Sequence, residues 1–223
     1  GLGMAPARCQ VDPALLQCAR GAGPDCLPPA LLAALRAAMA GPRDAAGRPA
    51  YVAWHWDPGV AAPGWRAWTL GEASAGATAT ARNLDARPGA AGPERRSLRH
   101  FRERDGRLLL MHGAADPVVS PWATVEYLEH AQADLGGADA AADVVRAFVV
   151  PGMNHCAGGP ATDRFDGLEA IVKWVEFGLR PDRIEARGSA VLRDETRPLC
   201  PWPTVARYRG TGRVHDSASH ACR

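Results

Sequence analysis

An acidic residue and a histidine each follow an apolar run in this sequence. Asp116 comes after the run 108–111, and His155 comes after the run 148–150, beyond a Pro-Gly turn. An acid after one strand and a histidine after the next is the arrangement of the second half of a serine-hydrolase triad on a parallel sheet. The histidine would remove the proton of an attacking hydroxyl, and the acid would orient the imidazole and stabilise its cation. Asp116 and His155 are therefore the candidate acid and base.

The sequence offers no serine in the setting that a triad nucleophile needs. The serines are Ser74, Ser97, Ser120, Ser189, Ser217 and Ser219. None lies in Gly-x-Ser-x-Gly, and none follows an apolar run and precedes a helical pattern. Ser120 is better explained as a helix cap. We therefore expect the nucleophile, and the oxyanion-hole amides beside it, to lie outside this chain.

Two alternatives to a triad are open. An aspartate after a strand is often a turn former or helix cap, and a single histidine is often structural, so the pair could have no catalytic role. A metalloenzyme is disfavoured, because no two of the seven histidines stand at His-x-x-x-His spacing and no Cys-x-x-Cys occurs.

Apolar periodicity predicts the elements that would position the two residues. Helices are expected at 28–40, 121–135 and 166–179, and strands at 107–111, 144–150 and, more briefly, within 184–191. The tryptophan-rich stretch 50–71 is typical of an irregular loop, and 73–96 of a surface connection or a partly disordered linker. Strand–helix–strand–helix order at this length predicts a βαβ unit with a parallel sheet, and so an α/β fold.

Composition limits the classes of function. The chain has 223 residues, and its net charge of +2 is too small to indicate nucleic acid or an anionic membrane surface as a partner. No apolar run approaches the 18 residues of a membrane span. The first residues do not resemble a signal peptide, which fits a mature or truncated chain as well as a cytosolic one. Six cysteines favour disulfides and an oxidising compartment.

Four stretches resemble the tannase and feruloyl esterase family. They are LLMHGAADP at 109–117, VPGMNHC at 150–156, DRFD at 163–166 and TRPLCPWP at 196–203. The run from Cys9 to Asp44 resembles the lid domain of the same family. The resemblance is weakest over 72–100, where the family's lid normally runs longer.

The resemblance implies a fold and an activity. The fold would be the carboxyl-terminal part of an α/β-hydrolase sheet (101–223), joined by a linker (72–100) to part of an inserted, disulfide-linked lid (1–71). Asp116 would be the triad acid and His155 the base of a secreted or periplasmic serine carboxylesterase. Its substrate would be a small aromatic ester, and catalysis would need no cofactor. Lacking a nucleophile, the chain is expected to be inactive by itself.

The resemblance also implies roles for the cysteines and for one metal. Cys18 would pair with Cys26, and Cys200 with Cys222. Cys9 and Cys156 would bond to partners upstream of this chain, which would leave Cys156 a free thiol here; three pairs within the chain are the alternative. The family's lid binds a structural calcium, to which the Leu2 carbonyl would contribute, although the carboxylate ligands are absent from this sequence.

The lid covers the acyl pocket in this family. Its candidate substrate-binding residues here are Trp54, Trp56, Trp65, Arg66 and Trp68. Alternatively, at least two of the tryptophans form the core of the lid, and Arg66 faces solvent. The competing function for the whole chain is a non-catalytic fragment or interaction module that needs an amino-terminal partner.

Overall fold

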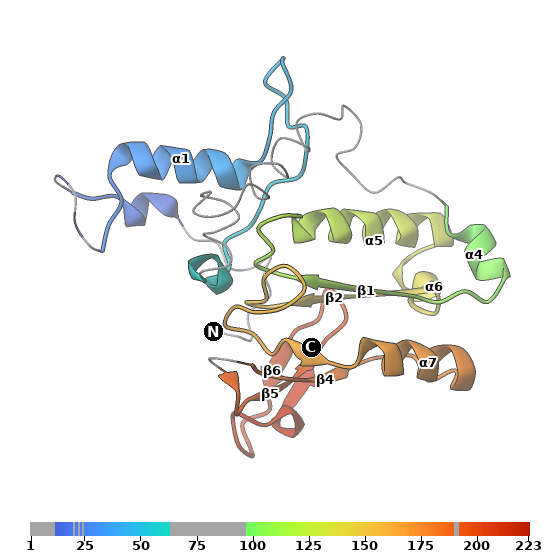
Figure 1. The fold of residues 1–223 in the computed structure, drawn as a ribbon. Coiled ribbons are helices and arrows are strands. Elements are labelled where there is room, and N and C mark those ends of the chain that lie inside the picture. Colours follow the sequence, from blue (N-terminus) through green and yellow to red (C-terminus); the bar gives the residue numbers. More distant parts are fainter. Residues whose placement is uncertain (1–11, 20, 22, 24, 63–96, 190–191) are drawn as a thin grey trace.

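The computed structural model describes residues 12–19, 21, 23, 25–62, 97–189 and 192–223. Two parallel strands, β1 (Leu108–Gly113) and β2 (Val145–Val150), pair along their whole length. Helix α5 (Pro121–Leu135) and the short helix α6 (Ala138–Ala142) connect them (Figure 1). The expected strand–helix–strand unit is therefore confirmed, and the chain is of the α/β class.

Both faces of this sheet are covered. Helix α5 lies on one side, and α7 (Gly167–Phe177) lies on the other (Figure 1). Because successive strand residues point to opposite faces, each strand contributes to two apolar clusters. The cluster on the α5 side contains Leu98, Leu128, Ala131, Leu135, Ala141, Val144, Val145 and Ala147. The cluster on the other side contains Phe148, Val150, Met153, Ala161, Ile184, Ala186 and Leu199.

Helix α5 begins directly after the loop that contains Asp116. The Ser120 hydroxyl accepts a hydrogen bond from the Trp122 amide, so it caps the helix as expected. Pro121 takes the first helical position, where its missing N–H costs nothing. The helix ends at Gly136, which adopts the left-handed conformation.

The carboxyl-terminal residues form small antiparallel sheets, of which the sequence indicated only one strand. One sheet contains β3 (Arg164–Phe165), β4 (Ile184–Arg187) and β5 (Thr196–Leu199), and the other contains β6 (Ala206–Tyr208) and β7 (His220–Cys222). A disulfide joins Cys200 to Cys222. The Trp202 amide donates to the Ala147 carbonyl at 2.8 Å, which attaches this region to β2.

The amino-terminal region contains the 3₁₀ turns η2 (Pro13–Leu16) and η3 (Pro58–Ala61) and the helix α1 (Pro29–Ala40). The expected helix at 28–40 is confirmed to within one residue. Cys18 pairs with Cys26, so both of the expected disulfides are present. Cys156 has an exposed free thiol, and Cys9 lies outside the described residues. The two disulfides agree with an oxidising compartment.

Helix α7 turns its apolar stripe towards solvent. The stripe consists of Leu168, Val172 and Val175, which recur at helical spacing and are between 37% and 74% exposed. Phe177 at the end of the helix and Leu179 after it are also exposed, at 69% and 60%. Trp174 is the buried residue of the helix. The helix stops at Phe177, two residues earlier than expected, because Gly178 adopts a left-handed conformation.

A short helix precedes β1. Helix α4 (Arg99–Glu103) lies across the expected boundary between the linker and the carboxyl-terminal domain, and the division at residue 101 remains a prediction. No helix in the described ranges combines the length and apolarity needed to cross a membrane.

Candidate active site

The loops that follow β1 and β2 lie against each other. The Ala114 amide donates to the Val150 carbonyl at 2.8 Å, and the Ala115 amide donates to the Met153 carbonyl at 2.9 Å. Gly113 makes this approach possible, because a Cβ there would lie 2.3 Å from the carbonyl oxygens of Met153 and Asn154. The sequence therefore brings the two strand ends into direct contact by placing glycine at this position.

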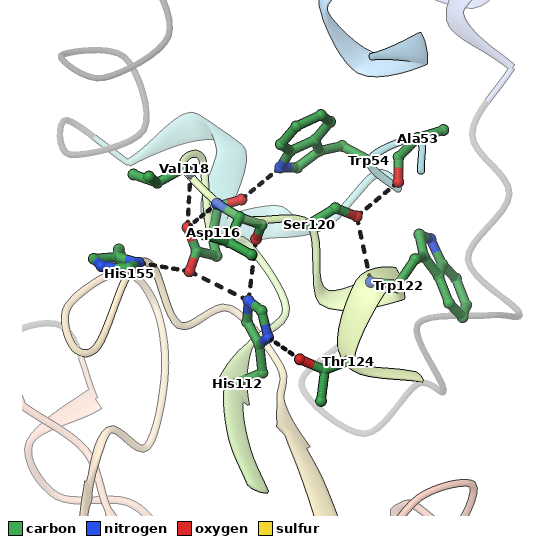
Figure 2. A network of polar contacts seen from close by, with 10 residues as sticks. Ala53, Trp54, His112, Asp116, Val118, Ser120, Trp122, Thr124 and His155 are labelled. Atoms are coloured by element: carbon green, nitrogen blue, oxygen red, sulfur yellow. Dashed lines mark hydrogen bonds and ion pairs between the residues drawn. The ribbon is translucent and has the colours of Figure 1, made fainter. Parts of the chain in front are cut away.

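Asp116 and His155 meet at this edge of the sheet. His155 Nδ1 lies 2.7 Å from Asp116 Oδ2 (Figure 2). The Asp116 side chain is 4% exposed, whereas that of His155 is 44% exposed, so the acid is enclosed and the base reaches the surface. The expected proximity of the pair is confirmed; their catalytic roles remain a prediction.

Three hydrogen bonds and one contact with a further imidazole hold the Asp116 carboxylate. Oδ1 accepts from the amides of Val118 and Val119 at 2.7 and 3.0 Å, and Oδ2 faces the rings of His155 and His112 at 2.7 and 3.3 Å (Figure 2). Burial would raise the pKa of Asp116, but these bonds together lower it below its ordinary value. The carboxyl group is therefore ionised at neutral pH and fixed in orientation.

An ionised Asp116 determines the tautomer of His155. A carboxylate oxygen only accepts hydrogen bonds, so the proton between the two groups belongs to Nδ1. In the neutral ring, Nε2 then carries the lone pair. A half-exposed imidazole with its lone pair at Nε2 can take a proton from a hydroxyl, as a general base does.

The segment 51–62, from the expected lid, is bonded to the Asp116 loop. The Trp54 indole N–H donates to the Asp116 carbonyl at 2.8 Å, and the Ser120 hydroxyl donates to the Ala53 carbonyl at 2.7 Å (Figure 2). Trp54 thus has a structural contact at the site. The remaining candidate substrate-binding residues are Trp56, which is partly buried, and Trp65, Arg66 and Trp68, which lie outside the described residues.

Asp57 bonds the same segment to the His155 loop. Its Oδ1 accepts from the Gly59 amide at 2.8 Å, and its Oδ2 accepts from the Gly152 amide at 3.2 Å. Burial raises the pKa of Asp57 despite these two bonds. The sequence reasoning missed Asp57; its signal was the Asp-Pro-Gly order of a capped turn. Segment 51–62 therefore contacts the loops of both acid and base.

The described serines have contacts away from His155. Ser97 and Ser189 donate to Asp134 and Asp163, and Ser217 accepts from Arg183. Ser219 lies with Ser217 in the turn η5 (Ser217–Ser219), while Ser74 lies outside the described ranges.

The expected calcium ligand Leu2 also lies outside the described residues. Within the ranges that the structure covers, no group of three or more histidine, cysteine or acidic side chains could hold a metal ion.

His55 should make the stability of the protein sensitive to acid. Its ring packs edge-on against Trp122, and neither ring nitrogen has a hydrogen-bond partner among the described residues. Burial lowers the pKa of His55 to about 4, with a smaller contribution from His112. The unfolded chain binds a proton at His55 more readily than the folded protein does. The stability of the fold with a neutral His55 is therefore fully present above about pH 6.5 and is lost as the pH falls towards 4.

We expect the wild-type free energy of unfolding to fall by about 3 kcal/mol more than that of His55→Leu between pH 7 and pH 4. Urea denaturation at several pH values measures both. The exposed His130 provides a matched control, since His130→Leu should keep the wild-type pH dependence. An equally steep acid loss in His55→Leu would contradict the assignment.

Comparison with known proteins agrees with this architecture. Residues 94–223 match the family model described as tannase and feruloyl esterase. The mono(2-hydroxyethyl) terephthalate hydrolase of Piscinibacter sakaiensis is 35% identical, in a match that covers 93% of this chain and 43% of that protein. The solved feruloyl esterase B from Aspergillus oryzae superposes with a TM-score of 0.70 at 21% identity, over 98% of this chain and 51% of that one. A second esterase from Aspergillus oryzae gives 0.72 at 19% identity, with the same coverage.

This chain belongs to the tannase and feruloyl esterase family. It has the fold of part of these esterases, and it spans about half the length of the relatives that it matches.

Proposed function

We propose that this chain supplies the acid and the base of a serine carboxylic ester hydrolase whose nucleophilic serine lies on a separate segment. The observation that carries the proposal is the 2.7 Å contact between His155 Nδ1 and a buried, ionised Asp116. Membership of an esterase family supports the same reaction class. Without the serine, the chain is inactive.

The geometry suggests how the pair would act. His155 Nε2 takes the proton of the serine hydroxyl as the serine oxygen attacks the ester carbonyl, and Asp116 stabilises the imidazolium. The imidazolium then protonates the departing alcohol, leaving an acyl-enzyme. Water, deprotonated by the same nitrogen, releases the acid and regenerates the serine.

The proposed substrate is a small ester of an aromatic acid. The names of the relatives, a terephthalate monoester hydrolase and feruloyl esterases, support this class. Trp56, Trp65, Arg66 and Trp68 are the residues proposed to contact the acyl ring, while Trp54 is already bonded to the Asp116 loop. The two disulfides support a secreted or periplasmic location.

Reconstitution tests this proposal. The isolated chain is expected to hydrolyse neither p-nitrophenyl nor gallate esters. Co-expression with the part of the Piscinibacter sakaiensis relative that this match does not cover should give hydrolysis that His155→Ala abolishes. Hydrolysis by the isolated chain that His155→Ala removes would disprove the need for an outside serine. Activity of the assembled protein that survives His155→Ala would disprove the role of the base.

A second function, an interaction module with an amino-terminal partner and no catalysis, is favoured by one surface. Within the described residues, β1 pairs with β2 and with no other strand, and the α7 stripe is exposed. An open strand edge beside an apolar helix face suits association with another polypeptide. A stable, inactive complex in the co-expression experiment would support this function over the first.

A further inference from the structure

His112 lies beside the proposed acid, Asp116. It is the second-last residue of β1, and its side chain is 11% exposed. The ring points into the loop that contains Asp116 (Figure 2). A role for the His112 ring at this site rests on the proposed function of Asp116 as the triad acid. Such a role adds His112 to the residues that serve the proposed triad.

The contacts of His112 determine where its proton lies. Nε2 is 3.0 Å from the Val119 carbonyl oxygen and 3.3 Å from Asp116 Oδ2, and both oxygens only accept hydrogen bonds. Nε2 therefore carries a hydrogen, which bonds the Val119 carbonyl and also faces Asp116 Oδ2. Nδ1 is 2.6 Å from the Thr124 hydroxyl, which can donate to it. Helix α5 thus orients the ring from one side while the Asp116 loop binds it on the other.

This arrangement places two imidazoles on one carboxylate oxygen. His155 approaches Asp116 Oδ2 from the loop after β2, whereas His112 approaches from β1 itself. His112 is held by Thr124 and Val119 and is nearly enclosed, so its position does not depend on the half-exposed base. Oδ2 therefore keeps a fixed donor even when His155 moves or exchanges its proton.

We propose that His112 is a positioning residue of the proposed triad, whose Nε2–H keeps the Asp116 carboxylate ionised and aimed at His155. A second donor on Oδ2 stabilises the ionised carboxylate, as hydrogen bonds to a charged form do. In agreement with this geometry, His112 contributes the largest single lowering of the Asp116 pKa. Within the part of the chain that the structure describes, His55 also interacts electrostatically with His112, and Tyr51 with Asp116; both come from segment 51–62.

NMR of the isolated chain tests the proposal. In the wild type, nitrogen-15 shifts should show the neutral His112 ring with its proton on Nε2. The carbon-13 signal of the Asp116 carboxylate should titrate below the ordinary aspartate range. His112→Leu should move that titration upward by about 0.5 to 1 pH unit, the equivalent of one hydrogen bond. His112→Gln, which retains an N–H donor, should recover at least half of the shift, and the exposed His100→Leu should cause none.

Two results would overturn the proposal. One is a wild-type His112 ring that carries its proton on Nδ1, a measurement that needs no variant to fold. The second is an Asp116 titration that His112→Leu leaves unchanged, as expected if His112 only anchors the Val119 carbonyl. Neither measurement uses catalysis, so the proposal can fail while reconstituted hydrolysis succeeds, and the reverse is equally observable.

Discussion

Asp116→Asn is expected to lower kcat for ester hydrolysis by the assembled enzyme by about 10⁴-fold, the effect of imposing the wrong imidazole tautomer in a triad. Asparagine can keep its oxygen on the amides of Val118 and Val119. Its NH₂ group then faces the His155 ring, where the wild type has an acceptor. His155 Nδ1 must accept that hydrogen bond, so the proton of the neutral ring moves to Nε2 and the base has no lone pair for the serine.

Two measurements check this expectation. Steady-state kinetics on a gallate ester, with the chain assembled as in the reconstitution, gives the loss of kcat. Nitrogen-15 shifts of the isolated variant should show the His155 proton moved from Nδ1 to Nε2. Asp134→Asn is the matched control, because Asp134 lies on α5 and bonds Ser97 and Arg99 away from the site; it should retain activity within about two-fold. A loss of less than ten-fold in Asp116→Asn would contradict a triad.

The sequence predicted the elements that local patterns encode. β1 and β2 are apolar runs with turn residues after them, and α5 has a serine cap and a proline at its start, so each could be placed within about two residues. Because parallel strands end at the same edge of a sheet, the proximity of Asp116 and His155 could be predicted from those elements.

Contacts between distant segments had no local signal. The hydrogen bond from Trp54 to the Asp116 carbonyl joins residues 62 positions apart, and the contact of Asp57 with Gly152 spans 95. Nothing in the composition of the Trp-rich stretch distinguishes a side chain that binds a ligand from one that binds the framework. His112, in contrast, lies only four residues before Asp116 in the sequence. The direction of its ring could still not be predicted, because it depends on the conformation of the turn between the two residues.

The sequence did not predict most strands of the small antiparallel sheets, and the reason is a different one. β3, β6 and β7 contain two or three residues each, which is too short to show an alternating pattern. Their stability comes from non-local attachments, such as the Cys200–Cys222 disulfide and the Trp202 contact with β2. The apolar stripe of α7 could be predicted from its helical periodicity. Its exposure could not, because periodicity does not show whether another segment covers an apolar face.

Phe148→Ala is expected to reduce the free energy of unfolding by about 3 to 5 kcal/mol, the range for truncating a buried phenylalanine. Phe148 is 1% exposed and belongs to the cluster that joins β2 to β4 and β5. It also forms a bridge with Pro201, so the cavity would open between the strand that leads to His155 and the disulfide-linked carboxyl-terminal region. Urea denaturation gives the stability of the variant.

Phe177→Ala makes the same change at the exposed end of α7. Phe177 is 69% exposed, so its truncation should alter the free energy of unfolding by no more than about 0.5 kcal/mol. Equal losses at Phe148 and Phe177 would contradict this difference and would mean that the Phe177 side chain is covered in solution. Repeating the denaturation at two protein concentrations then separates the causes, because only association of chains makes the loss at Phe177 depend on concentration.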